Sequence, residues 1–226
     1  LTLNATAVDF ADSFSPASLT VNGPLTISAP LTLTASDTTD GVLDFTDTIS
    51  VLGDTIFSAT EINLAGAVTS GGPFALCFQP ALNSTVVRLG GTTDLGAAVL
   101  DLTSAELALI GSGFSSLQFG SATSTGGIVV ASDVTFQNSV IFRGLSGGTQ
   151  VCGDVVTSCD AITFNDQVII CDDVTIDSTN AGAVAAGANV TFGSSIVSDG
   201  ASNHRALTVA SGTLGVQNAA MLSCTS

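Results

Sequence analysis

The amino-acid sequence predicts an all-β protein, a right-handed parallel β-helix whose turns take about 28 residues each. The first observation is a repeated phrase: Val134–Phe136, Ile162–Phe164 and Val190–Phe192 each read apolar-Thr-Phe and follow one another at intervals of 28 residues. The second is composition, since the chain has no Lys and only two Glu, whereas Gly, Ser, Thr, Asp and Asn dominate its polar residues. Such residues favour turns and strand margins over exposed helix faces, which excludes a mostly helical fold.

The repeated phrase also predicts what fills the core. In each copy a second apolar cluster follows after two or three polar or small residues, so one turn supplies two or three short strands separated by bends. Residues on alternate positions of a strand share a face. We therefore expect Phe136, Phe164 and Phe192 to stack in one core ladder.

The first part of the chain follows the same rules with a shorter period. The phrases Leu19–Val21, Leu25–Ile27 and Leu31–Leu33 recur every six residues, with Pro24 and Pro30 between them. Proline suits bends because no ladder donor is needed there. We predict three short strands with tight corners; a left-handed hexapeptide helix is the competing interpretation, but the period is not continued.

One segment departs from the strand pattern. Thr103 and Glu106 form a capping-box motif ahead of an apolar run, which predicts one or two helical turns within Leu102–Ile110, with a distorted strand as the alternative. No hydrophilic linker divides the chain, so we expect residues 1–226 to form a single β-solenoid domain. Because Leu1 opens within strand-like sequence, we interpret the chain as a processed fragment or repeat segment of a longer one.

Charge excludes two classes of partner. The formal net charge is −16, and nucleic acids and anionic membranes both need clustered Lys or Arg. No apolar run reaches the roughly 18 to 20 residues of a membrane-spanning helix, so membrane insertion is not expected. A mean hydropathy of +0.57 predicts a folded chain in spite of the acidity.

The reactive residues do not form a catalytic motif. His204 and Arg205 lie together in an apparent bend, which predicts a solvated loop tip, and no second His accompanies them. We predict no catalytic residues, no cofactor-binding residues and no enzyme activity. Among Cys152, Cys159 and Cys171 one disulfide is expected in an oxidising compartment; buried unpaired thiols are the alternative.

Aspartate is the one residue type that suggests a metal. Hard carboxylate ligands suit Ca²⁺, and a calcium site is the one cofactor that remains possible, although no known calcium-loop motif is present. The alternative is that isolated acids at strand ends cap turns. The candidate ligands are Asp154, Asp160, Asp166, Asp172, Asp173 and Asp177.

Two segments resemble a known family. Leu100–Val130 reads LDLTSAELALIGSGFSSLQFGSATSTGGIVV, and Asp173–Val216 contains DVTIDSTNAGAVAAGANVTFGSSIVSDGASNHRALTVASG. Both are similar to repeat units of large bacterial surface exoproteins of the filamentous-haemagglutinin type. The resemblance implies a right-handed β-helix, export to the cell surface or medium, and a role in adhesion, aggregation or filament building.

These observations together predict a secreted or cell-surface structural or adhesive module. Its expected partners are other copies joined end to end or neighbouring repeats of the same polypeptide, and a host or matrix receptor is possible. Two alternatives stay open. The phrase Thr32–Thr34 fits an ice-binding solenoid, and parallel β-helices also include carbohydrate-binding or carbohydrate-cleaving proteins.

Overall fold

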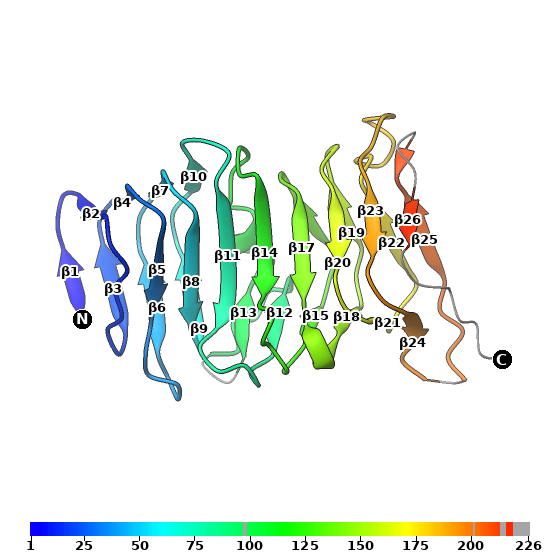
Figure 1. Cartoon of the computed structure of the whole chain (residues 1–226), viewed down its shortest axis with the longest axis horizontal. Coiled ribbons are helices and arrows are strands. Elements are labelled where there is room, and N and C mark those ends of the chain that lie inside the picture. Colours follow the sequence, from blue (N-terminus) through cyan, green and yellow to red (C-terminus); the bar gives the residue numbers. More distant parts are fainter. Residues whose placement is uncertain (97–98, 201, 213–215, 219–226) are drawn as a thin grey trace.

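Short runs of alternating apolar and polar residues form the strands of the computed structural model, which describes residues 1–96, 99–200, 202–212 and 216–218. In a typical strand, Leu25 and Ile27 are buried and Thr26 between them is only partly so. This period of two puts every second side chain into the core. Figure 1 shows the strands side by side along the longest axis, with β1 (Thr2–Asn4) at one end and the last strands at the other.

The strands form five open parallel sheets, named here A to E. Sheet A runs β1, β3 (Leu19–Asn22), β6 (Val42–Phe45), β9 (Glu61–Leu64). Sheet B runs β2 (Val8–Phe10), β4 (Leu25–Ile27), β7 (Ile49–Val51), β10 (Val68–Ser70). Sheet C runs β5 (Leu31–Thr34), β8 (Thr55–Ala59), β11 (Ala75–Pro80), β14 (Ser116–Gly120), β17 (Val140–Arg143), β20 (Ile162–Phe164), β23 (Val190–Phe192), β26 (Val216–Asn218).

The second part of the chain replaces sheets A and B by D and E while sheet C continues. Sheet D runs β13 (Leu100–Leu102), β12 (Val87–Leu89), β15 (Ile128–Val130), β18 (Thr149–Val151), β21 (Val168–Ile170), β24 (Ile196–Ser198). Sheet E runs β16 (Val134–Phe136), β19 (Val155–Thr157), β22 (Val174–Asp177), β25 (Leu207–Ala210). The chain thus visits three sheets in rotation, first A, B, C and later D, E, C. The all-β prediction with parallel sheets is confirmed, and the arrangement is consistent with a β-helix.

The core contains a phenylalanine ladder on the inner face of sheet C. Six phenylalanines pair in register on successive strands, with neighbouring ring centroids 4.8 to 6.1 Å apart. They are Phe57, Phe78, Phe119, Phe142, Phe164 and Phe192. Their rings lie within the distance at which aromatic pairs stabilise one another beyond simple burial.

The ladder differs from the predicted one in one member. Phe164 and Phe192 are register partners, but Phe136 lies on β16 of sheet E. It packs on Phe119 at 5.6 Å and on Phe142 at 6.3 Å from across the core. The repeated apolar-Thr-Phe phrase therefore occurs on two different sheets, because the number of residues between bends varies along the chain.

The constant 28-residue turn is wrong for the same reason. Phe164 and Phe192 are separated by 28 residues, but the register pairs Phe142 with Phe164 and Val8 with Leu25. Loops absorb these differences, since a longer bend costs little extra entropy when the strands that flank it keep their pairing.

The chain leaves its rotation once, between β12 and β14. After β12 it turns back, and β13 pairs with β12 on the side away from β15 while also contacting β9. A single helical turn follows, α1 (Ser104–Leu107), with the predicted capping box between Thr103 and Glu106. This confirms the predicted helix. Farther along, a 3-10 turn, η1 (Leu145–Gly147), precedes β18.

Candidate functional site: a buried cluster of carboxylates

Three acids meet where β13 lies beside β9. Glu61 opens β9, Asp101 is the central residue of β13, and Asp94 lies in the segment between β12 and β13. One carboxylate oxygen from each side chain lies within 4.8 Å of the other two. Residues 40 apart in the sequence are brought together because β13 takes a place out of chain order.

Strand alternation sets the direction of two of the three side chains. Ile62 and Leu64 point into the core, so Glu61 points outward; Leu100 and Leu102 do the same for Asp101. An outward position is normally exposed, yet Glu61 is 5% and Asp101 only 2% exposed. The segment before β13 covers them.

Asp101 and Asp94 are stabilised by the covering segment itself. The Leu95 amide donates to both carboxylate oxygens of Asp101, at 3.2 and 3.3 Å. The Gly96 amide donates to Oδ1 of Asp94 at 2.8 Å, and the Asp94 side chain is exposed. The carboxylates therefore fix the shape of the segment that encloses them.

Glu61 is the member whose hydrogen bonding is incomplete. Its Oε1 accepts from the amide of Ile62 at 3.2 Å. Its Oε2 is buried and has no hydrogen-bond partner. A buried polar atom without a partner is costly, so in a native structure it calls for a proton, an ion or a ligand.

The electrostatics follow from burial and from like charges. Burial, followed by the charges of Asp101 and Asp94 and then by Glu106 of α1, raises the pKa of Glu61 to about 8 against the opposing Ile62 hydrogen bond. Burial also raises the pKa of Asp101, although the Leu95 hydrogen bond and the charge of Arg88 lower it. The site concentrates negative charge under a low-dielectric cover.

The second glutamate of the chain supports the same region. Glu106 Oε1 accepts from the amide of Leu64 at the end of β9, and Oε2 accepts from the amide and hydroxyl of Thr103. Both glutamates of the chain thus lie around the junction of β9, β13 and α1. Their rarity was a signal in the sequence, but nothing in it placed β13 beside β9.

The acids predicted as calcium ligands are used differently. Asp154 Oδ1 accepts from the amide of Thr175, and Asp166 Oδ2 accepts from that of Leu145. Asp172 Oδ1 accepts from the amide of Asp173, whose own Oδ1 accepts from that of Ala206. Within the described residues these acids form no group of three converging ligand atoms. They stabilise turns and strand starts, as the alternative interpretation held.

The two remaining acids of that prediction are also accounted for locally. Asp177, at the end of β22, accepts three hydrogen bonds from Thr179 and Ala181. The backbone carbonyl of Asp160 accepts from the hydroxyl of Thr157, and burial raises the pKa of its carboxyl.

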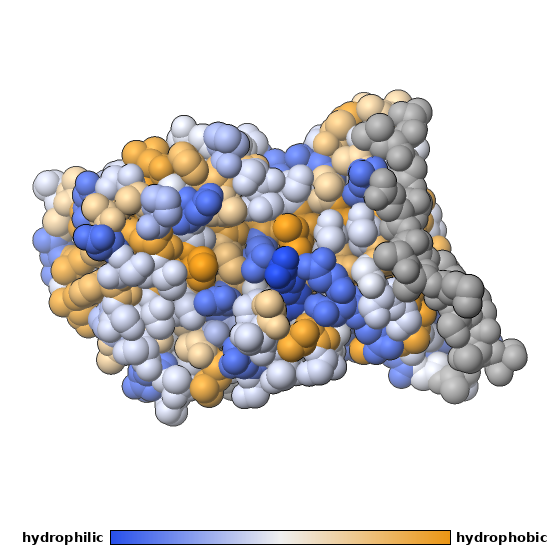
Figure 2. Space-filling model, in the orientation of Figure 1, coloured by the Kyte–Doolittle hydropathy of each residue, from blue (hydrophilic) through white to orange (hydrophobic). Residues whose placement is uncertain are grey.

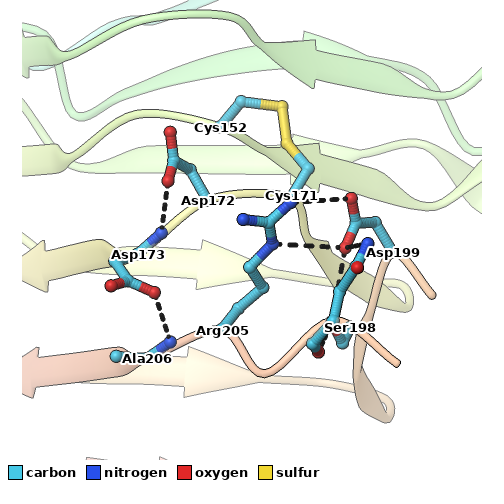
Figure 3. A network of polar contacts seen from close by, with 9 residues as sticks. Cys152, Cys171, Asp172, Asp173, Ser198, Asp199, Arg205 and Ala206 are labelled. Carbon is cyan, nitrogen blue, oxygen red and sulfur yellow. Dashed lines mark hydrogen bonds and ion pairs between the residues drawn. A yellow bond between two sulfur atoms is a disulfide. The ribbon is translucent and has the colours of Figure 1, made fainter. Parts of the chain in front are cut away.

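Of the three cysteines considered for a disulfide, two are joined. Figure 3 shows the bridge between Cys152 and Cys171, which end successive strands β18 and β21 of sheet D. Cys159 is an exposed free thiol in a left-handed backbone conformation, with φ of 65°. The bridge ties two neighbouring turns covalently.

The predicted loop tip near His204 contains an ion pair. Arg205 donates to Asp199 through Nε at 3.4 Å and Nη2 at 3.3 Å, and Asp199 also accepts from the side chains of Asn203 and Ser198 (Figure 3). These hydrogen bonds, that of Arg205 first, hold the pKa of Asp199 below its usual value. An exposed pair of this kind shapes the bend and contributes little to stability.

The outer face of sheet C is the face turned to the viewer in Figure 2. Hydrophilic residues gather over β14 and β17, and hydrophobic residues form several separate patches. A hollow of about 490 Å³ opens over β5, β8 and β11, lined among others by Thr32, Ile56 and Cys77. The register pairs Thr32 with Ile56 and Thr34 with Ser58, so the Thr-Leu-Thr phrase does not continue onto the next strand.

Comparisons with known proteins give no further guide: no protein-family model, no curated protein and no solved structure matches the chain. In the described part of the chain, no helix has the length and apolar character needed to cross a membrane.

Proposed function

We propose that the chain is a right-handed β-solenoid that serves as a structural or adhesive module outside the cell, as one segment of a surface fibre or as a subunit that assembles end to end. The observation that carries the proposal is the rotation of parallel strands through three sheets around one phenylalanine ladder. Stacked turns of this kind contact only their neighbours, so the fold is extended by adding turns at its ends.

The disulfide supports the extracellular part of the proposal. Cys152 and Cys171 are bridged between adjacent turns, and such bridges persist in oxidising compartments but are reduced in the cytosol. The net charge of −16 and the scattered hydrophobic patches of the visible face suit a solvated surface.

The edge at β1 supports association. Strand β1 ends sheet A and pairs with β3 on one side only. The carbonyl of Leu1 and the amide of Ala5 both bond β3, so by the alternation of a parallel ladder the amides of Thr2 and Asn4 point to the free side. An open edge of this kind can take up a strand from another copy or another turn.

Electron microscopy of concentrated protein tests assembly. We expect fibres whose width matches a single stack, and fewer or shorter fibres for Thr2→Pro, which removes one outward amide. Thr2→Ser keeps the amide and is the matched control. Particles that stay single at every concentration would remove end-to-end assembly from the proposal.

Small-angle X-ray scattering of the unassembled protein tests the solenoid itself. A rod-like profile with a single cross-section along its length is expected. A profile of a sphere of the same mass would contradict the stacking of turns, and with it every functional statement above.

A further inference from the structure

We propose that Glu61, Asp94 and Asp101 bind one divalent cation, with Ca²⁺ as the best match, at the place where β13 lies beside β9. The proposal goes beyond a scaffold function and does not depend on it. Two independent observations carry it: three carboxylate oxygens converge within 4.8 Å, and the nearly buried Glu61 points an oxygen without a partner into the same place.

The spacing of the oxygens favours calcium. Ca²⁺ binds oxygens at about 2.3–2.6 Å, so two ligands on opposite sides of the ion lie up to roughly 5 Å apart. The separation of at most 4.8 Å fits that span without movement of the backbone. Mg²⁺ binds at about 2.0–2.1 Å, which limits opposite ligands to roughly 4.2 Å and requires the cluster to contract.

The ligand chemistry excludes softer metals. All three side chains offer carboxylate oxygen, whereas structural zinc sites are built from cysteine and histidine. Calcium also accepts irregular coordination and fills its remaining positions with backbone carbonyls and water. The exposed side of Asp94 gives the ion a way in from solvent.

No other positive group in the site satisfies Glu61. Arg88 is the register partner of Asp101, but its Nη1 donates to the carbonyl of Gly90 at 3.1 Å. In the described residues no ion pair joins Arg88 to any of the three acids. A proton on Glu61 would supply one donor and leave the two aspartates facing each other, whereas a cation neutralises all three.

The ion would act as a clamp. It would join the start of β9, the segment after β12 and the centre of β13, which are the three parts that meet at the departure from chain order. The parts of the site that are far apart in sequence gain most from such a link.

Isothermal titration calorimetry of the chelator-treated protein with CaCl₂, and separately with MgCl₂, tests the proposal. We expect one calcium site and at least tenfold weaker magnesium binding. Glu61→Gln and Asp101→Asn should each weaken calcium binding at least tenfold. Asp133→Asn removes an exposed acid elsewhere and keeps the Oδ1 that accepts from the Asp154 amide, so it should bind like the parent.

Thermal melting followed by far-UV circular dichroism gives the second readout. Calcium should raise the melting temperature of the parent and of Asp133→Asn but not of Glu61→Gln. Asp94→Asn changes an exposed ligand, so its fold is secure, and it should lose part of the shift. A folded parent that shows neither calcium heat nor a melting shift, or equal loss in Asp133→Asn and Glu61→Gln, overturns the proposal.

Discussion

Glu61 and Asp177 are both carboxylates at 5% exposure, yet their surroundings are opposite. Asp177 Oδ1 accepts from the amide and the hydroxyl of Thr179, and its Oδ2 accepts from the amide of Ala181, all at 2.6 Å. Burial alone would raise the pKa of Asp177, but these hydrogen bonds outweigh it and lower the pKa. Glu61 has one amide donor and two acidic neighbours, and its pKa is raised to about 8.

The difference teaches what makes a buried charge tolerable in a stacked fold. A carboxylate at a strand end is satisfied when the next turn of chain curls over it with its amides, as residues 178–181 do. A carboxylate on the outer face of a strand receives no such amides, because the ladder already uses them. Such a group needs a charge from elsewhere.

The largest effect should come from removing the satisfied acid. Asp177→Ala leaves two amides and a hydroxyl without their acceptor, so we expect a loss of about 3 kcal/mol in the free energy of unfolding. Urea denaturation followed by circular dichroism measures it. The exposed Asp133→Ala serves as the comparison and should lose less than about 1 kcal/mol. Equal losses would mean that the turn at Asp177 is held by other contacts.

The same carboxylate should make stability depend on pH. Its folded pKa is lower than the ordinary value of 3.8, so the unfolded chain binds the proton more tightly. The stabilisation is complete above 3.8 and is lost as the pH falls through the lowered folded value. The stability difference between the parent and Asp177→Asn should therefore shrink below about pH 4. A difference that stays constant down to pH 2 would contradict the lowered pKa.

A smaller loss is expected from the hydroxyl partner. Thr179→Val keeps the shape of the side chain and the amide to Asp177 but removes the hydroxyl, which also accepts from the amide of Gly182. We expect a loss of about 1–2 kcal/mol, one charge-assisted hydrogen bond. Thr175→Val is the control, since Asp154 is bound by the Thr175 amide, which the change retains.

The smallest effect, of opposite sign, should come from the unsatisfied acid. Without metal, Glu61→Gln removes one of three converging negative charges, so we expect a gain of about 1 kcal/mol at neutral pH. Denaturation in the presence of a chelator measures it. A clear loss instead would show that the Glu61 carboxylate is satisfied by a contact that the amide cannot make.

Local patterns predicted much of this fold. The phrases at Leu25–Ile27 and Leu31–Leu33 form strands β4 and β5, and Thr103 with Glu106 caps α1. The turn length was predicted wrongly, because an identical phrase occurs on sheet E at Phe136 and on sheet C at Phe164. Nor did the spacing of aspartates identify the acidic cluster, since two of its members lie on strands that are not consecutive.

The sequence by itself determined the parallel all-β class, the position of the helical turn and the residues of the core, because alternation and capping act over a few neighbouring residues. Only the tertiary structure decided which strands are neighbours, where the disulfide forms, and that β13 lies beside β9. Pairing depends on the length of every bend between two strands, and no short stretch of sequence contains that sum. For this reason Glu61 reads as an ordinary surface residue until Asp94 and Asp101 are placed beside it.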